Sequence, residues 1–411
     1  MAESKCEMPP DSVSVTCTAP VNIAVIKYWG KRDTTLILPI NSSLSATIHQ
    51  DTMRSRTTIV ASKSFQSDSM ALNNEEVAMG TRLQTVIRAL RARAQDLVDE
   101  SGTVLVPKAD WPLYKLRIVS DNNFPTAAGL ASSASGLACF TSCLAALFQF
   151  EERFKGELSG VARQGSGSAS RSMYGGFVKW IKGERADGTD SIAKQVATVQ
   201  DWPEMRVLIC VVNGAKKKIG STQGMQLGVK TSPLLKFRAE NVVEPRMREM
   251  ERAIRTKDFP AFAKLSMQDS NQFHATCLDT YPPIFYMNDT SKRIVNAIHE
   301  LNAAAGVPLA GYTFDAGPNA VIYTLEKYMS TVMALLLHYF QPREANLRTF
   351  VQDNLHLWAN QPGDEPLLAA AKKSMGPRLP GDSVRTVIVS KPGPGPIIVD
   401  RSQSFTRSKL C

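Results

Sequence analysis

The stretch NNFPTAAGLASSASGLAC, residues 122–139, constrains the fold more than any other part of this sequence. Ala, Ser and Gly supply little side-chain volume, so this segment is suited to bring the backbone close to something other than a packed core. A strand is predicted before it, at 114–120, and an apolar helix after it, at about 133–150. Such a loop directs backbone N–H groups and the helix dipole at an anion, for which phosphate is the best candidate. The alternative is a small-residue helix that packs tightly against a neighbour.

The loop matches neither of two common nucleotide-binding patterns. No Gly-Lys-Ser/Thr closes it as in a Walker A loop, and it is not G-x-G-x-x-G. A second run of small residues, GSGSASR at 165–171, ends in a cation. It is either another anion site, with Ser166 and Ser168 as hydroxyl donors, or a flexible turn.

The length of 411 residues favours two domains over one. Trp202 and Pro203 precede the strong strand MRVLICVVN, after which the composition turns helical, so we predict domains at 12–200 and 201–400. The first domain has strands at 13–18, 45–48 and 56–61 and a helix from 82 to about 97. The second has helices at 233–255, 261–269 and 292–305, strand-like arms at 309–313 and 320–325, and a last strand at 384–389.

The net charge of +10 is compatible with nucleic acid, an anionic membrane surface or phosphorylated small substrates. The sequence shows no RNA-binding motif and no zinc-finger spacing, which disfavours nucleic acid. It has no signal-peptide pattern and no apolar run that could span a bilayer. Seven scattered cysteines without a C-x-x-C pair fit reduced thiols. We therefore expect a cytosolic protein that binds neither nucleic acid nor membranes; the SKL tripeptide precedes Cys411 and is discounted as a peroxisomal signal.

Two further clusters could contact a ligand. NIAVIKYWGKR, residues 22–32, places two lysines beside two aromatics, which suits a charged substrate with an apolar part or a solvated turn. Asp315 in TFDAGPNA acts either as a base or, as the pattern alone favours, as a cap of the turn. His274 and Cys277 lack further metal ligands nearby, so we assign them to packing and expect no zinc.

Together these motifs resemble a known superfamily. The loop with Pro125, Gly129, Leu130 and 132–135 is similar to the phosphate loop of the galactokinase, homoserine kinase, mevalonate kinase and phosphomevalonate kinase group. Within it, the motifs NIAVIKYWGKR, ILPINSSLS, NNFPTAAGLASSAS, GSGSASRSMYGGF and FDAGPNA resemble, in this order, those of the diphosphomevalonate decarboxylases. The resemblance extends from 15 to about 396. It implies an α+β fold of two domains, a ribosomal S5 domain 2-like N-terminal domain and a mixed α/β C-terminal domain, with a deep cleft between them.

The resemblance also implies a reaction, the ATP-dependent decarboxylation of (R)-5-diphosphomevalonate to isopentenyl diphosphate, ADP, phosphate and carbon dioxide in isoprenoid and sterol biosynthesis. A tertiary alcohol is a poor leaving group, so ATP first phosphorylates it. Loss of that phosphate leaves positive character on carbon, and the neighbouring carboxylate departs as carbon dioxide. ATP and Mg²⁺ are the implied cofactors, and a homodimer is the implied assembly.

Site residues follow from the same resemblance. Asp315 orients or deprotonates the tertiary hydroxyl. Arg171 holds the substrate carboxylate because a guanidinium fixes the geometry better than a lysine can, while Asn22 helps to position that group and Lys27 adds positive charge. The residues implied in binding substrate and its diphosphate are Tyr28, Trp29, Gly30, Lys31, Arg82, Ser166, Gly167, Ser168, Ala169, Ser170, Arg171 and Thr222. Those implied for ATP are Gly129, Ser132, Ser133 and Ser221, with Ser133 also on magnesium.

One position departs from part of the family. Bacterial members often carry Ser-Arg where this chain has Ser221 and Thr222, as in animal-type members. The lysine run at 216–218 either supplies the missing charge or is a solvated face. Three other functions remain as alternatives: a kinase that stops after phosphorylation, a decarboxylase of the monophosphate, and a nucleic-acid-binding protein, for which the charge is the argument.

Overall fold

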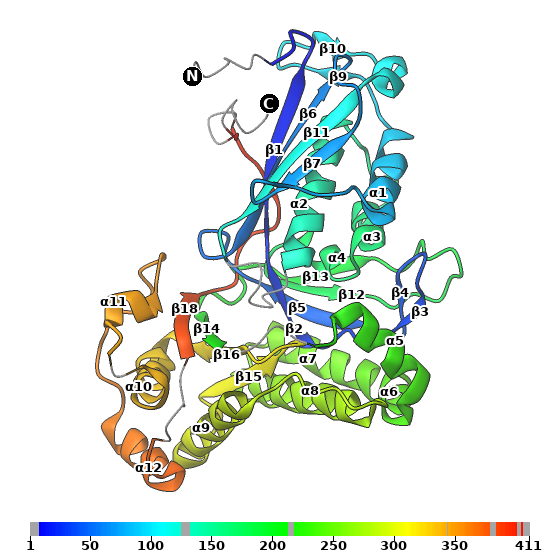
Figure 1. Cartoon of the computed structure of the whole chain (residues 1–411). Helices are drawn as coiled ribbons and strands as arrows, with labels where there is room; N and C mark the ends of the chain where they lie inside the picture. Colours follow the sequence, from blue (N-terminus) through cyan, green and yellow to red (C-terminus); the bar gives the residue numbers. More distant parts are fainter. Residues whose placement is uncertain are drawn as a thin grey trace.

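The structure of the chain is a computed structural model that describes residues 8–124, 132–212, 218–342, 344–378, 384–400 and 404–405. Within these residues the strands form three extended sheets with helices on their faces (Figure 1). We call them the N-terminal sheet, of order β19-β1-β6-β11-β7-β8, the middle sheet, of order β13-β12-β5-β2, and the C-terminal sheet, of order β15-β16-β14-β18-β17. Two short ribbons pair β9 with β10 and β3 with β4.

The strands have these bounds: Val13–Pro20 (β1), Asn22–Ile26 (β2), Lys31–Asp33 (β3), Leu38–Pro39 (β4), Ser43–Thr47 (β5), Arg54–Ser62 (β6), Ser69–Leu72 (β7), Glu75–Glu76 (β8), Leu97–Val98 (β9), Val104–Val106 (β10), Lys115–Asn122 (β11), Phe177–Trp180 (β12), Ala193–Ala197 (β13), Met205–Val212 (β14), Ala310–Phe314 (β15), Ala320–Leu325 (β16), Val351–Gln352 (β17), Val384–Ser390 (β18) and Ile397–Ile398 (β19).

The helices have these bounds: Thr81–Arg91 (α1), Ser132–Leu147 (α2), Glu157–Gly165 (α3), Ala169–Ser172 (α4), Ser221–Thr231 (α5), Pro233–Phe237 (α6), Val243–Arg255 (α7), Phe259–Asp279 (α8), Asp289–Ala305 (α9), Met329–Phe340 (α10), Leu347–Phe350 (α11) and Glu365–Met375 (α12). Short 3₁₀ turns cover Lys108–Leu113 and Glu326–Tyr328, and a π-helical segment covers Arg238–Val242. The expected α+β fold is confirmed.

Helix α2 covers one face of the N-terminal sheet (Figure 1). Its small residues allow a close approach, since Cys139 Sγ lies 3.0 Å from the Cys17 carbonyl oxygen and Cys143 Sγ lies 3.0 Å from that of Val15. The small residues of the helix itself therefore serve tight packing against the sheet, which was one of the two interpretations of this stretch. The other interpretation, a loop that binds phosphate, depends on residues 125–131, which lie outside the described residues.

A shared hydrophobic core joins the middle and C-terminal sheets. Helix α8 contacts β2 of the middle sheet and β15 and β16 of the C-terminal sheet. Its Phe262 contacts Phe177 on one side and Tyr323 on the other, at ring-centroid distances of 6.0 and 5.3 Å. After β18 the chain returns to the N-terminal sheet, where β19 pairs with β1. The change from middle to C-terminal sheet falls between Ala197 and Met205; the domain bounds 12–200 and 201–400 remain a prediction.

Several predicted helix ends are confirmed by their caps. The side chain of Ser232 accepts a hydrogen bond from the Leu235 amide at the start of α6, with Pro233 in the first turn. Gly306 ends α9 with a φ of +66°, a conformation that glycine adopts at little cost. Among the described residues, no helix combines the length and apolar character that crossing a bilayer requires.

Three predicted helices were wrong in extent. The helix predicted from 82 to about 97 ends at Arg91. The prediction was too long because Leu97, although it lies in strand β9, is buried in the same core and so extends the apolar pattern. The helix at 233–255 is interrupted by the π-helical segment Arg238–Val242. The helix predicted at 261–269 extends over 259–279. The prediction was too short because buried polar residues such as Asp269 and His274 interrupt the apolar pattern of the sequence.

We expect Gly311→Ala to destabilise the protein. A Cβ at this position of β15 would lie 2.7 Å from the Ala263 Cα and 3.0 Å from its carbonyl oxygen, so the α8 backbone would have to move. The free energy of unfolding should fall by about 1–3 kcal/mol, measured by urea denaturation. As a control, a Cβ at Gly80 meets nothing within 4 Å, and Gly80→Ala should cost no more than about 1 kcal/mol, the loss expected where alanine replaces glycine at a helix N-cap. Equal losses in both variants would contradict this packing.

Candidate active site

An ion pair joins the middle sheet to the C-terminal sheet. Strand β2 is buried throughout and ends at Ile26, so the next residue, Lys27, leaves the sheet with its side chain only 3% exposed. Asp315 follows β15 in the turn before β16. Lys27 Nζ donates to Asp315 Oδ1 at 2.7 Å, and the aspartate side chain is 37% exposed. The pair thus has a buried cation and a carboxylate that solvent or a ligand can reach.

The environment of Lys27 lowers its pKa. Burial is the largest cause, Asp315 and Asp269 oppose it, and Arg171 adds to the lowering. The turn that carries Asp315 is closed by the backbone, since the Gly317 amide donates to the Asp315 carbonyl oxygen at 2.7 Å. The Asp315 carboxylate is thereby left to pair with Lys27.

Arg171 is a buried cation held by hydroxyl groups. Its Nε donates to Ser45 Oγ and its Nη1 to Ser43 Oγ, both at 2.6 Å, from alternate positions on one face of β5. Asn22 Oδ1 lies 3.3 Å from the same Nε, and its Nδ2 donates to Ser172 Oγ at 2.7 Å. Burial lowers the pKa of Arg171 to about 10, so the guanidinium remains charged at neutral pH.

No carboxylate in the described part of the chain forms an ion pair with Arg171. Burying an unpaired charge is costly, and neutral hydroxyl partners repay only part of that cost. A carboxylate or phosphate group of a bound ligand would pair with Arg171 and neutralise this charge. The arrangement is therefore typical of an anion-binding site.

The small-residue run at 165–171 covers the end of α3, the connecting residues 166–168 and the start of α4, and most of it is buried. A Cβ on Gly167 would lie 2.7 Å from the Trp180 ring and 3.2 Å from that of Tyr28, so only glycine fits. Ser170 Oγ donates to the Gly167 carbonyl oxygen, while the hydroxyls of Ser166 and Ser168 lie 3.3 Å apart. The predicted binding residues 166–171 are thus brought beside Asn22 of β2.

Lys31 and Arg82 place further positive charge near this turn, and Tyr28 adds a buried hydroxyl. The Tyr28 ring packs edge-on against Trp180 at 4.7 Å, and its hydroxyl is buried with no partner among the described residues. Burial raises the pKa of Tyr28, while Arg171 and Arg82 lower it. Lys31 has a lowered pKa, first through burial and then through the like charge of Arg82. Two neighbouring cations and an unpaired hydroxyl suit a phosphate-rich ligand.

Trp29 differs from the other predicted binding residues. Its ring is buried between Phe273 and Tyr286, at centroid distances of 4.9 and 5.8 Å. Gly30 follows with a φ of +95°, and a Cβ there would lie 2.6 Å from Ile40. The Trp29 side chain therefore belongs to a core cluster, and Gly30 turns the chain toward β3.

The predicted ATP-binding residues lie at two helix starts. Ser132 and Ser133 begin α2, and Ser133 is exposed. Ser221, followed by the predicted substrate-binding residue Thr222, begins α5, which contacts β3 and α8. Helix α2 packs on α4, the helix that carries Arg171. Gly129 lies outside the described residues.

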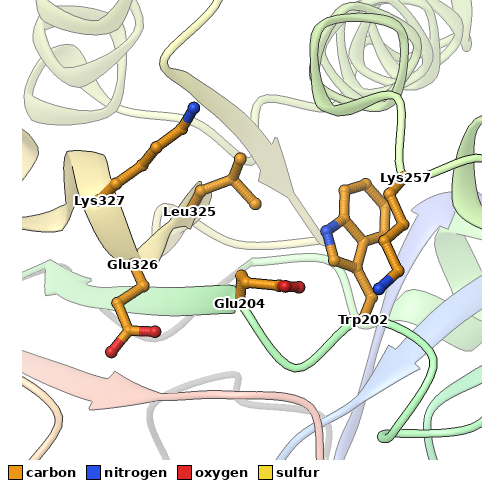
Figure 2. Close-up of a pocket in the computed structure, with 6 residues that line it drawn as sticks. All are labelled: Trp202, Glu204, Lys257, Leu325, Glu326 and Lys327. Atoms are coloured by element: carbon orange, nitrogen blue, oxygen red, sulfur yellow. The ribbon is translucent and has the colours of Figure 1, made fainter.

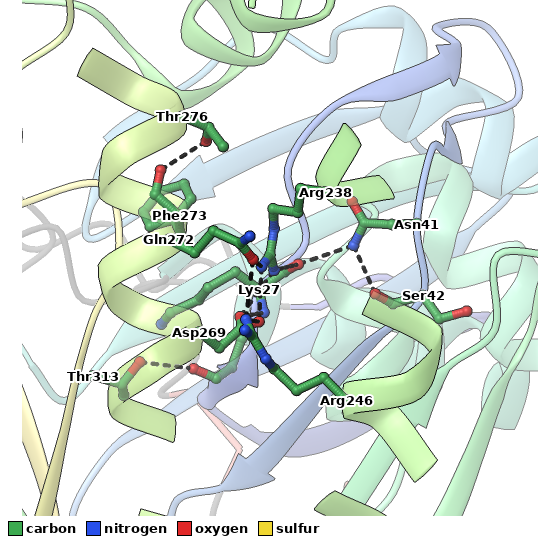
Figure 3. Close-up of polar contacts among 11 residues, drawn as sticks. Lys27, Asn41, Ser42, Arg238, Arg246, Asp269, Gln272, Phe273, Thr276 and Thr313 are labelled. Carbon is green, nitrogen blue, oxygen red and sulfur yellow. Dashed lines mark hydrogen bonds and ion pairs between the residues drawn. The ribbon is translucent and has the colours of Figure 1, made fainter. Parts of the chain in front are cut away.

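Sequence reasoning missed a buried charge cluster beneath Lys27. Asp269 of α8 accepts hydrogen bonds from Arg238, Arg246 and the Lys27 amide (Figure 3). Sequence reasoning also assigned no role to Ser43 and Ser45, although both lie in the motif ILPINSSLS. Their alternation was a usable signal, whereas no local pattern pairs Asp269 with residues far away in the sequence.

The pocket in Figure 2 is separate from this site. It has a volume of about 440 Å³ and is lined by Trp202, Glu204, Lys257, Leu325, Glu326 and Lys327. None of the predicted site residues lines it. Its two acids and two lysines balance in charge, which does not suit a polyphosphate.

His274 is a neutral histidine in the core of the site. Its ring packs against Phe273 and Phe314, at centroid distances of 4.7 and 6.2 Å. Burial lowers its pKa to about 4, with a smaller contribution from Lys27. Within the described residues no cluster of three or more His, Cys, Asp or Glu could hold a metal, and the prediction that His274 is a packing residue fits this environment.

We expect His274 to make the stability of the protein depend on pH. Its folded pKa of about 4 lies below the ordinary value of 6.5, so its contribution is complete above pH 6.5 and is lost as the pH falls toward 4. The free energy of unfolding should fall over this range by roughly 3 kcal/mol more in wild type than in His274→Gln. Urea denaturation at several pH values measures this, with the exposed His356→Asn as control, since asparagine tolerates the positive φ of 51° at this position. Identical pH slopes in wild type and His274→Gln would refute the assignment.

Comparison with known proteins identifies the family. The family model of the "Diphosphomevalonate decarboxylase-like N-terminal domain" matches residues 19–193, and that of the "Mevalonate 5-diphosphate decarboxylase C-terminal domain" matches 207–399. The diphosphomevalonate decarboxylase of Rattus norvegicus is 52% identical over 392 residues, covering 95% of this chain and 94% of the relative.

Solved structures agree with this result. A crystal structure of mevalonate 5-diphosphate decarboxylase has a TM-score of 0.79 and 42% identity, covering 95% of this chain and 100% of its own. A structure described as MDDEF in complex with MVAPP, AMPPCP and magnesium has a TM-score of 0.71 and 27% identity, covering 95% and 99%. With the site geometry above, these matches show that the chain belongs to the diphosphomevalonate decarboxylase family of enzymes.

Proposed function

We propose that the site around Lys27, Asp315 and Arg171 carries out the reaction of this family, the ATP-dependent decarboxylation of (R)-5-diphosphomevalonate to isopentenyl diphosphate. The observation that carries the proposal is the pairing of a reachable carboxylate with a buried lysine, next to a buried guanidinium without an acidic partner among the described residues. A substrate with a hydroxyl, a carboxylate and a diphosphate needs these groups together.

Each residue has a role in this proposal. Asp315, held by Lys27, accepts the hydrogen of the tertiary hydroxyl and so orients its oxygen toward the terminal phosphate of ATP. Arg171 binds the substrate carboxylate, and its fixed plane keeps the carbon–carbon bond aligned with the carbon–oxygen bond that breaks. As phosphate leaves, the electrons of the carbon–carbon bond form the new double bond and carbon dioxide is released. Asn22 supports Arg171 through Oδ1.

The remaining predicted residues bind the phosphate groups. Tyr28, Lys31, Arg82, Thr222 and the turn 166–170 hold the substrate diphosphate, while Ser132, Ser133, Ser221 and Gly129 contact ATP. Few acidic ligands are needed for Mg²⁺, which keeps waters and binds through nucleotide phosphates. The described residues fit this, since they offer no acidic cluster, and the exposed Ser133 hydroxyl would be its protein contact. When bound, Mg²⁺ offsets the charge of the transferring phosphate.

The relative solved with MVAPP, AMPPCP and magnesium supports ATP and magnesium for this chain. The assembly, a homodimer, is proposed from the family resemblance, and the compartment, the cytosol without binding to nucleic acid or membrane, from the signals and motifs of the sequence. Sedimentation velocity and cell fractionation test these two points.

Product analysis tests the function. With ATP, magnesium and (R)-5-diphosphomevalonate, wild type should form ADP and carbon dioxide in equal amounts. Asp315→Asn should lose both by about 100-fold or more, because the hydroxyl is no longer oriented by a carboxylate. ADP without carbon dioxide would mean a kinase instead, and neither product from wild type would overturn the proposal.

Arg171→Lys tests the role of the guanidinium. A lysine keeps the charge but cannot reach Ser43, Ser45 and a substrate carboxylate together, so kcat/KM should fall roughly 100-fold. Arg163→Lys is the matched control, since this arginine is also buried but bonds the Gly188 carbonyl oxygen and is not one of the predicted site residues. The control should lose stability but keep kcat/KM within about threefold. Equal losses of kcat/KM would argue against a specific role for Arg171.

A further inference from the structure

Asp269 is a fully buried carboxylate with no role in the chemistry described above. Its side chain and that of Arg238 are both 0% exposed. Arg238 Nη1 donates to Oδ1 at 2.8 Å and Nη2 to Oδ2 at 2.9 Å, a bidentate pair, and Arg246 Nη1 donates to Oδ1 at 2.8 Å. Gln272 Oε1 accepts from both arginines (Figure 3). Two guanidinium groups and one carboxylate leave this cluster with a net positive charge.

The cluster holds the Lys27 backbone on both sides. The Lys27 amide donates to Asp269 Oδ2 at 2.7 Å. The Lys27 carbonyl oxygen accepts from Arg238 Nη2 at 3.3 Å and from Asn41 Nδ2 at 3.0 Å. Because both peptide groups that flank its Cα are fixed, the direction in which the Lys27 side chain leaves β2 is fixed as well.

The same turn of α8 also holds the partner of Lys27. The next residue, Ser270, accepts a hydrogen bond from the Phe314 amide at 2.9 Å, directly before Asp315. Adjacent residues of one helix thus position the two groups of the Lys27–Asp315 pair, although these groups lie 288 residues apart in the sequence. A rigid helix is well suited to fix such a distance.

Stability alone does not account for this cluster. A buried ion pair adds little free energy over a well-packed apolar cluster of similar volume, because desolvation offsets the attraction. Burial would raise the pKa of Asp269, but Arg238, Arg246 and the Lys27 amide hold it below its ordinary value. The carboxylate therefore stays charged, at a cost that an apolar core would not have.

We propose that Asp269 is a positioning residue for this reaction: its carboxylate fixes the Lys27 peptide and, with Ser270, holds Lys27 Nζ against Asp315. The inference rests on the proposed function of Lys27 and Asp315. Asp269 touches neither of the two side-chain ends and acts through the backbone of Lys27 and the field of its own charge.

The first test is Asp269→Asn, which keeps the shape and removes the charge. Turnover should fall about 100-fold while KM for both substrates stays within about threefold, because binding groups remain and the hydroxyl-orienting pair is displaced. Glu251→Gln is the matched control, since it removes the part-buried ion pair with Lys179 outside the site. Its kcat and KM should stay near those of wild type. An unchanged kcat in Asp269→Asn would overturn the proposal.

The pH dependence separates positioning from simple structural support. The charged or titratable groups that face Lys27 are Asp315 from the β15–β16 turn, Arg171 from α4, Arg238 from the π-helical segment, and Asp269 and His274 from α8. Without the Asp269 charge Lys27 should lose its proton more easily, so the alkaline limb of kcat/KM should move down by about one pH unit.

Arg246→Gln should shift the alkaline limb of the kcat/KM profile to higher pH, opposite to the shift expected for Asp269→Asn. Arg246 is partly exposed, so this variant is expected to fold even where Asp269→Asn does not. Loss of its charge leaves Asp269 less neutralised, which raises the pKa of Lys27 and moves the alkaline limb up. Shifts in the same direction, or none, would overturn the proposal.

An NMR titration of the Lys27 Cε resonance, assigned with Lys27→Met, gives the same information without turnover. If wild type makes no carbon dioxide, the proposed function fails. If wild type is active but the Lys27 titration is the same in Asp269→Asn, only this inference fails.

Discussion

The ion pair between Lys27 and Asp315 is the interaction on which the rest of the site depends. Its two residues come from different sheets, so it forms only if those sheets are held at a fixed distance. Hydrogen bonds from Thr313 to the Ala24 carbonyl oxygen and from Tyr323 to that of Ile23 tie the sheets together beside it. The shared apolar core around Phe262 makes the connection rigid.

The site carries more buried positive charge than the described residues neutralise. Arg171 is bonded to hydroxyls, and the cluster at Asp269 contains two arginines for one carboxylate. Such charge lowers stability in the free protein and is repaid when an anionic ligand binds. A substrate with a carboxylate and a diphosphate, together with ATP, would supply that compensation.

Helix α8 contributes to both the core and the site. Phe262 and Phe273 pack into apolar clusters, while Asp269, Ser270 and His274 face the two strands that carry Lys27 and Asp315. This mixture explains why the periodicity of the sequence predicted only part of the helix. Polar residues on a buried face look like the end of an apolar stripe when the sequence is read alone.

The sequence by itself determined the α+β class, the strands β1, β5, β6, β11, β14, β15, β16 and β18, the caps of α6 and α9, and the family, because these depend on local patterns and on motifs of contiguous residues. It also named Lys27, Asp315, Arg171 and Asn22, which lie in those motifs. Only the tertiary structure decided that Trp29 belongs to the core, that Ser43 and Ser45 hold Arg171, and that Asp269 holds Lys27. Those contacts join residues far apart in the chain, and their geometry is set by packing between sheets and helices, which no local pattern records.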